Sequence, residues 1–155
     1  MPKAAGSVEM AGTVLAFDFG IKRIGVAVGN TLISIAHPLQ TIATEVTSIR
    51  FSQVATLVAA WQPTLLLVGL PCYLDGQEHE ISRLSRRFAR RLQGRFDMRG
   101  GMWDERLSSV AASHTLNALG ITGRQQKTVL DQVAAQHILQ DYLDTPDKIS
   151  CLIQP

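Results

Sequence analysis

Runs of apolar residues with two different spacings divide the chain into predicted strands and helices. Short β-prone runs bounded by glycine, proline or polar residues predict strands. They lie at 13–29, which predicts a hairpin, and at 31–43, 64–71 and 96–104. The run 64–71 is continuously apolar, as strands are when helices cover both faces of a parallel sheet. In 31–43, His37 and Pro38 leave open whether one strand or two short extended pieces form.

Apolar residues at helical spacing predict four helices. The predicted ranges are 45–61, 78–93, Ser108 or Ser109 to 119, and 128–143. Thr44 is a candidate N-cap for the first, in which Trp61 is expected to be a core anchor. Gly94 is a candidate stop for the second, and the polar link 121–127 is expected to be a mobile loop.

The last predicted helix carries an acidic residue on its packing face. At 100° per residue, Asp131 lies in the middle of the apolar face. The apolar members of that face are Ala134, Ala135, Ile138 and Tyr142, and the opposite side holds Gln132, Gln136, Gln140 and Asp144. A buried carboxylate is costly unless it is paired, hydrogen-bonded or bound to a metal. Asp131 is therefore a candidate for chemistry.

The order of the elements predicts an α/β fold. Antiparallel strands followed by strand-helix-strand crossovers give a mixed sheet with helices on its faces. With 155 residues the chain fits one domain, expected at 13–144, between a loose N-terminus at 1–12 and a C-terminal tail at 145–155.

Composition and charge exclude some classes of protein. The two cysteines, Cys72 and Cys151, have no Cys or His neighbours at zinc-site spacing, which favours a reducing compartment over a disulfide framework. No signal peptide or membrane span is predicted, so a soluble cytoplasmic protein is expected.

The net charge of +2 is small, but the basic residues are clustered. Seven of the fifteen fall in one segment: Arg83, Arg86, Arg87, Arg90, Arg91, Arg95 and Arg99. A clustered basic face can contact phosphates. A solvated helix face paired with Glu78 and Glu80 is the alternative interpretation.

Three acidic residues are candidates for one metal site. Asp18 ends the first predicted strand, Glu105 follows the last one, and Asp131 lies on the helix face described above. Carboxylates without Cys or His suit Mg²⁺ or Mn²⁺, and paired metals of this kind hydrolyse phosphodiesters. Spacing alone does not show that the three meet.

Four motifs occur in one order along the chain. They are the stretch Asp18 to Ala27, the segment Val68 to Pro71 with Asp75-Gly76, the block Asp104 to Ser109, and Lys127 with Asp131 to Leu143. Together they resemble the YqgF family, the bacterial pre-16S rRNA nucleases that are also called Holliday-junction-resolvase-like proteins. The resemblance covers about residues 13–144.

The resemblance implies an RNase H-like fold with a five-stranded mixed sheet, three antiparallel strands and then parallel ones, flanked by helices. It implies that Asp18, Glu105 and Asp131 are the catalytic metal ligands, with a site for two Mg²⁺ or Mn²⁺ ions. Lys22, Arg23 and Arg106 match basic positions of the motifs and are expected to meet phosphate. We also expect nucleic-acid contacts from other basic residues: Arg83, Arg87, Arg90, Arg124 and Lys127.

The leading hypothesis is therefore a metal-dependent endonuclease that matures the 5′ end of 16S rRNA precursor. Its partners would be pre-16S rRNA or another structured nucleic acid, and ribosome-assembly intermediates. One alternative is a Holliday junction resolvase with the same metal site, which would need a dimer. Another is a ribosome-assembly factor that binds nucleic acid without catalysis.

Overall fold

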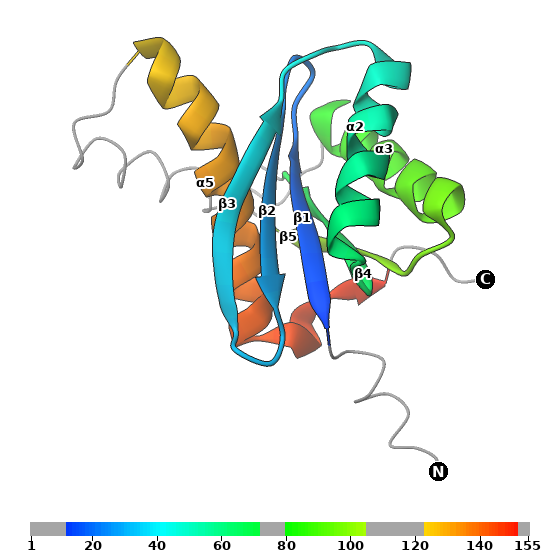
Figure 1. Ribbon diagram of the computed structural model, residues 1–155, viewed down its shortest axis with the longest axis vertical. Coiled ribbons are helices and arrows are strands. Elements are labelled where there is room, and N and C mark those ends of the chain that lie inside the picture. The colour runs from blue at the N-terminus through cyan, green and yellow to red at the C-terminus, as the bar shows by residue number, and fades with distance from the viewer. Residues whose placement is uncertain (1–11, 72–79, 105–122, 152–155) are drawn as a thin grey trace.

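A mixed β-sheet forms the centre of the molecule, and helices cover both of its faces (Figure 1). The computed structural model describes residues 12–71, 80–104 and 123–151. The strands are β1 (Thr13–Phe19), β2 (Ile24–Asn30), β3 (Ile35–Ile42), β4 (Leu65–Leu70), β5 (Gly100–Asp104) and β6 (Ser150–Cys151). The helices are α2 (Thr47–Trp61), α3 (Glu80–Phe96) and α5 (Gly123–Asp144), with a 3-10 helix η1 (Pro146–Lys148). None of the helices in these ranges has the length and apolar character needed to cross a membrane.

The strand order is β3-β2-β1-β4-β5-β6. The first three strands of the chain pair antiparallel, and β1, β4 and β5 pair parallel, which confirms the predicted five-stranded mixed sheet. The structure adds β6, which pairs antiparallel with β5 and comes from the predicted tail. β3 is one strand that contains Pro38, and its place at the sheet edge tolerates a residue without an N–H.

Alternation along the strands sorts the apolar side chains into two cores. Leu15 and Phe17 of β1 pack with α2 and α3 on one face of the sheet. Val14 and Ala16 pack with α5 on the other face. Because successive side chains of a strand point to opposite faces, Asp18 belongs to the α5 face and Phe19 to the face of α2 and α3. Phe19 indeed packs against the first core.

Helix α2 differs from its predicted orientation. Trp61, the predicted core anchor, is 42% exposed, while Arg50 and Phe51 are buried. The rings of Phe51 and Phe88 lie 5.8 Å apart, so packing against α3 turns this helix face inward. Thr44 is not the N-cap, because the helix begins at Thr47 and the Thr44 hydroxyl accepts the N–H of Val46.

Two helix ends also lie beyond their predicted positions. α3 continues through Gly94 to Phe96, where Phe96 packs against the core and the Arg95 guanidinium lies 5.0 Å from the ring centre of Phe51. These contacts outweigh the modest cost of glycine within a helix. α5 begins at Gly123, so residues 123–127, predicted as a mobile loop, are helical. The helix predicted to end at residue 119 lies outside the described residues.

The polar side of α5 packs along the edge strand β3, which it follows in Figure 1. Gln140 Oε1 accepts the N–H of Ala36 at 3.0 Å, and Gln136 Nε2 donates to the carbonyl of Ala36 at 3.0 Å. Gln132 Nε2 donates to the Thr41 hydroxyl at 3.2 Å. These glutamines, spaced four residues apart, form a glutamine ladder. It fixes the position of α5 along the sheet and therefore the position of Asp131.

Candidate active site at the end of β1

Asp18 lies near the end of β1 on the face that α5 covers. It is half-buried, and its cross-strand partner on β2 is Gly25. On the other side β4 runs parallel to β1, with Val68 in register with Phe17, so Gly69 lies level with Asp18. Glycines therefore flank Asp18 on both neighbouring strands.

Asp131 approaches the same place from α5. A Cβ atom on Gly25 would lie only 1.9 Å from the backbone carbonyl oxygen of Asp131, so the helix backbone rests directly on this glycine. Because Gly25 is also the partner of Asp18, the structure brings two of the three predicted acidic residues to one end of the sheet. They come from positions far apart in the chain, one on β1 and one on α5.

The Asp131 carboxylate has a cationic partner. Arg23 Nε donates to Asp131 Oδ2 at 2.7 Å, and the Asp131 side chain is 19% exposed. Arg23 was predicted to meet phosphate, whereas here it holds a carboxylate. Burial nevertheless raises the pKa of Asp131 above its ordinary value of 3.8, because desolvation outweighs the hydrogen bond and the charge of Arg23. Arg23 therefore compensates the buried charge only in part.

This donor set fits a hard divalent cation. Incompletely compensated carboxylate oxygen is what Mg²⁺ and Mn²⁺ prefer, and a divalent charge would favour the ionised form of Asp131. Among the described residues no group of three acidic, His or Cys side chains gathers to hold a metal. The third predicted ligand, Glu105, lies outside them. Asp104, directly before it, is exposed and belongs to the face of Met102, which packs toward α2 and α3.

The predicted nucleic-acid contacts divide between the two faces of the sheet. Lys22 is exposed in the β1–β2 turn, next to Arg23. Arg87 and Arg90 are exposed on α3, on the face opposite Asp131, and Arg83 is ion-paired with Glu80 at 2.5 Å. Arg124 and Lys127 fall in the first turns of α5, where only the backbone is described, and Arg106 lies outside the described residues. A nucleic acid that used both groups would have to pass over the end of β1.

Sequence reasoning missed Arg50, which is 7% exposed. Its Nη2 donates to the carbonyls of Gly20 at 2.9 Å and Ile21 at 2.6 Å, and its Nε donates to the carbonyl of Thr44 at 2.5 Å. The side chain thus ties the start of α2 to the turn that follows Asp18. A lone arginine in an apolar helix gives no sequence signal of this role, because two of its three acceptors are backbone atoms of a turn about thirty residues away.

The raised pKa of Asp131 predicts a specific pH dependence. The native state binds the Asp131 proton more tightly than the unfolded chain does, so this proton stabilises the fold below pH 3.8. The contribution is lost as the pH rises from 3.8 through the higher native pKa, and above that it is constant. Urea unfolding without divalent metal should show the stability of the wild type, relative to Asp131→Asn, falling over that window. A difference that rises with pH there would contradict the raised pKa.

Comparison with known proteins places this geometry in a family. The profile of the RuvX family, described as Holliday junction resolvase, matches residues 12–145. The chain belongs to the RuvX family. One relative from Methylobacillus flagellatus is 58% identical over 144 residues, which cover 93% of this chain and 97% of the relative. Another, from Nitrosomonas europaea, is 56% identical over 134 residues and covers 86% of this chain and 90% of the relative. Both are named "Putative pre-16S rRNA nuclease".

The RuvX-family chain also resembles solved structures. RuvC of T. thermophilus, in complex with a Holliday junction substrate, superposes with a TM-score of 0.55 at 12% identity. The match covers 90% of this chain and 99% of RuvC. At this identity the likeness concerns the fold, and it confirms the predicted RNase H-like architecture.

Proposed function

We propose that this RuvX-family chain is a metal-dependent endonuclease that hydrolyses phosphodiester bonds during 5′-end maturation of 16S rRNA precursor. The observation that carries the proposal is the convergence of Asp18 and Asp131 at the end of β1, with Asp131 only partly compensated by Arg23. The names of the relatives favour pre-16S rRNA as the substrate. Ribosome-assembly intermediates in the cytoplasm are then the setting in which the chain acts.

Asp18 and Asp131, joined by Glu105, would hold a site for two Mg²⁺ or Mn²⁺ ions. When such ions are bound, the chemistry they supply is Lewis-acid stabilisation of the charge that develops on the phosphodiester. Arg23 Nε holds Asp131 Oδ2 at 2.7 Å, and its guanidinium would be available to a phosphate oxygen if the carboxylate were bound to a divalent cation instead. Lys22, exposed in the same turn, provides a second positive charge for the nucleic-acid backbone.

A Holliday junction resolvase is the second candidate, because the matching family profile carries that description. The same acidic residues would serve it. A resolvase cuts two opposed strands of a four-way junction, so it needs two copies of the site, and the chain would have to form a dimer.

The test compares cleavage of a labelled pre-16S rRNA fragment and a four-way DNA junction, each with Mg²⁺, with Mn²⁺ and with EDTA. The proposal expects cleavage of the RNA that depends on the metal and that is roughly 10²- to 10³-fold slower in Asp18→Asn. Cleavage of the junction alone, by a chain that is dimeric in solution, would favour the resolvase. Tight binding of the RNA fragment without cleavage under any of these conditions would favour the non-catalytic assembly factor.

A further inference from the structure

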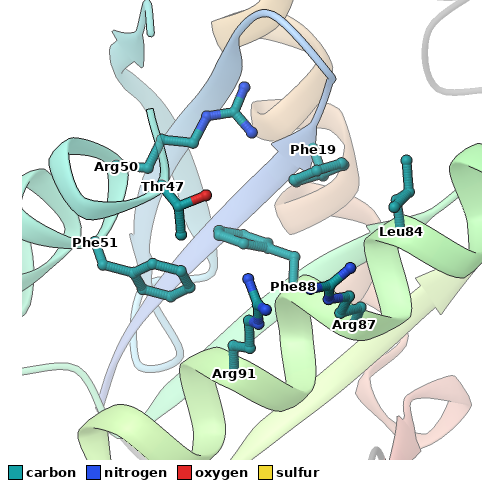
Figure 2. A pocket seen from close by; sticks show the side chains of 8 residues that line it. All are labelled: Phe19, Thr47, Arg50, Phe51, Leu84, Arg87, Phe88 and Arg91. Carbon is teal, nitrogen blue, oxygen red and sulfur yellow. The ribbon is translucent and has the colours of Figure 1, made fainter. Parts of the chain in front are cut away.

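A pocket of about 190 Å³ lies between α2 and α3, on the face of the sheet opposite Asp18 and Asp131. Figure 2 shows its lining. The residues come from both helices and the end of β1: Phe19, Thr47, Arg50, Phe51, Leu84, Arg87, Phe88 and Arg91. They are aromatic, aliphatic, hydroxylated or cationic, and none is acidic. The neighbouring acidic site does not use this pocket.

The apolar part of the pocket is built from three phenylalanine rings. Phe88 lies 5.1 Å from Phe19 and 5.8 Å from Phe51, measured between ring centres. Phe51 and Phe88 are each 4% exposed, whereas Phe19 is only partly buried. The Arg50 guanidinium lies 5.4 Å from the centre of the Phe19 ring, so a base would meet the exposed part of this ring together with the planar guanidinium. A planar ring system stacks favourably on such a surface.

The charged part consists of arginines from neighbouring turns of α3. Arg87 and Arg91 are exposed, and in Figure 2 they reach from α3 toward α2, beside the ring of Phe88. The other arginines at the same spacing are engaged, Arg83 with Glu80 and Arg95 over the ring of Phe51. No acidic partner of Arg87 or Arg91 lies within the described part of the chain. Guanidinium pairs of this kind match phosphate oxygens.

Together these features fit a nucleotide, which joins a flat base to a phosphate. The Thr47 hydroxyl, directed into the pocket in Figure 2, adds a neutral hydrogen-bonding group. A base that stacks between the two helices has its pairing edge against their side chains, so it cannot be paired with another base at the same time. The pocket therefore selects an unpaired nucleotide rather than a duplex.

The pocket is adjacent to the acidic site across one strand end. Phe19 directly follows Asp18 on β1, and their side chains belong to opposite faces. Arg50 lines the pocket and also holds the carbonyls of Gly20 and Ile21, so the turn between the two sites is fixed. The pocket and the acidic site thus lie on the two faces of one strand end, joined by the turn that Arg50 holds.

We propose that the pocket between α2 and α3 binds one unpaired nucleotide of the substrate strand, a few nucleotides from the phosphate that lies at Asp18 and Asp131. The base stacks on Phe19, and Arg87 and Arg91 hold its phosphate. The position of the cleaved phosphate rests on the proposed nuclease function, whereas the preference for single strands rests on the pocket alone. The substrate is thus RNA with a single-stranded stretch beside the cleavage point.

The test measures fluorescence anisotropy of a labelled single-stranded RNA, and of the same strand in a duplex, with the slowly cleaving Asp18→Asn chain as the parent. Removing Arg87 and Arg91 together (R87Q with R91Q) should weaken single-strand binding about tenfold or more. The slope of log affinity against log salt should fall by about 0.7 for each lost phosphate contact. The matched control, R83Q with R90Q, removes the same charge from the same helix outside the pocket. It should affect both probes by the same factor.

Two further variants test the apolar part without changing charge. Phe19→Leu should weaken single-strand binding about fivefold or more by removing the stacking surface, with no change in salt slope. Leu84→Trp should fill the pocket and abolish the preference for single strands, and it keeps the test valid if Phe19→Leu proves unstable. Wild-type preference in both variants would overturn the proposal.

Competition with a free mononucleotide tests whether the pocket binds a nucleotide of the substrate strand or a free nucleotide. The mononucleotide is added in competition with the single-stranded RNA. If it displaces the RNA at a mononucleotide concentration no higher than the dissociation constant of the RNA, the pocket is a site for small molecules and the assignment to the substrate strand is wrong. The nuclease function is judged separately, by cleavage with the intact Asp18. A preference for single strands without any cleavage would therefore support the proposed nucleotide pocket and contradict the proposed nuclease function.

Discussion

A Gly25→Ala variant should unfold at a lower urea concentration than the wild type and should cleave nucleic acid about 10²-fold more slowly. The added Cβ would lie 1.9 Å from the carbonyl oxygen of Asp131 and 2.3 Å from its carbonyl carbon. Both are backbone atoms, so α5 has to move by about an ångström, and Asp131 moves with it away from Asp18. Overpacking of this kind costs about 1–3 kcal/mol, and a misplacement of about 1 Å in a catalytic group costs about 10²-fold in rate.

Gly94→Ala is the matched control for this variant. A Cβ at Gly94 meets nothing within 4 Å, and the residue lies inside α3. The substitution should stabilise the chain by about 0.5–1 kcal/mol, the usual gain from alanine in a helix, and leave cleavage unchanged. If Gly25→Ala retained wild-type cleavage with a lowered urea midpoint, the placement of Asp131 would not matter to the reaction, and Asp131 would have to leave the proposed site.

The second large effect is expected at Asp18. Asp18→Asn should lower the cleavage rate roughly 10²- to 10³-fold, because the loss of several kcal/mol of metal-dependent stabilisation costs tenfold for about every 1.4 kcal/mol. The amide has the size of the carboxylate, so the fold should persist. Adding Mn²⁺ at about 100 times its dissociation constant should stabilise the wild type by about 2.7 kcal/mol, seen as a higher melting temperature, and should not stabilise the variant.

Asp144→Asn provides the control for charge. Asp144 is exposed at the end of α5 and accepts a hydrogen bond from Gln140 through Oδ1, which an asparagine can also accept. This variant should keep both the cleavage rate and the stabilisation by Mn²⁺. An Asp18→Asn chain that still melted at a higher temperature with Mn²⁺ would show that the metal binds elsewhere.

Local patterns were sufficient to predict most of the fold. The apolar runs predicted the hairpin, the parallel strand β4 and the mixed sheet, because a strand whose faces are covered carries apolar side chains on those faces. Helical periodicity also placed Asp131 on the inner face of α5, where its backbone packs on Gly25. The glycine itself was visible only as part of a motif. The close approach that requires it comes from a helix more than a hundred residues later.

The parts that the sequence did not predict depend on partners distant in the chain. Arg23 and Asp131 are 108 positions apart, so nothing near either residue indicates their ion pair. The orientation of α2 depends on the hydrogen bonds from Arg50 to the carbonyls of Gly20 and Ile21. It also depends on the packing of the Phe51 ring against the Phe88 ring. The apolar spacing of α2 alone predicted Trp61 as a buried residue. The arginines of α3 were predicted as one basic face, and their separation from the acids by the sheet appeared only in three dimensions.

The glutamine ladder has a consequence for the behaviour of this protein in solution. An edge strand exposes backbone N–H and C=O groups to which a strand of another molecule can add, and proteins that leave such an edge open risk aggregation. At Ala36, both of these groups are already taken by Gln140 and Gln136. The same side chains that fix the position of α5 thus block intermolecular strand pairing at Ala36, so a strand of another molecule cannot pair with β3 at this residue.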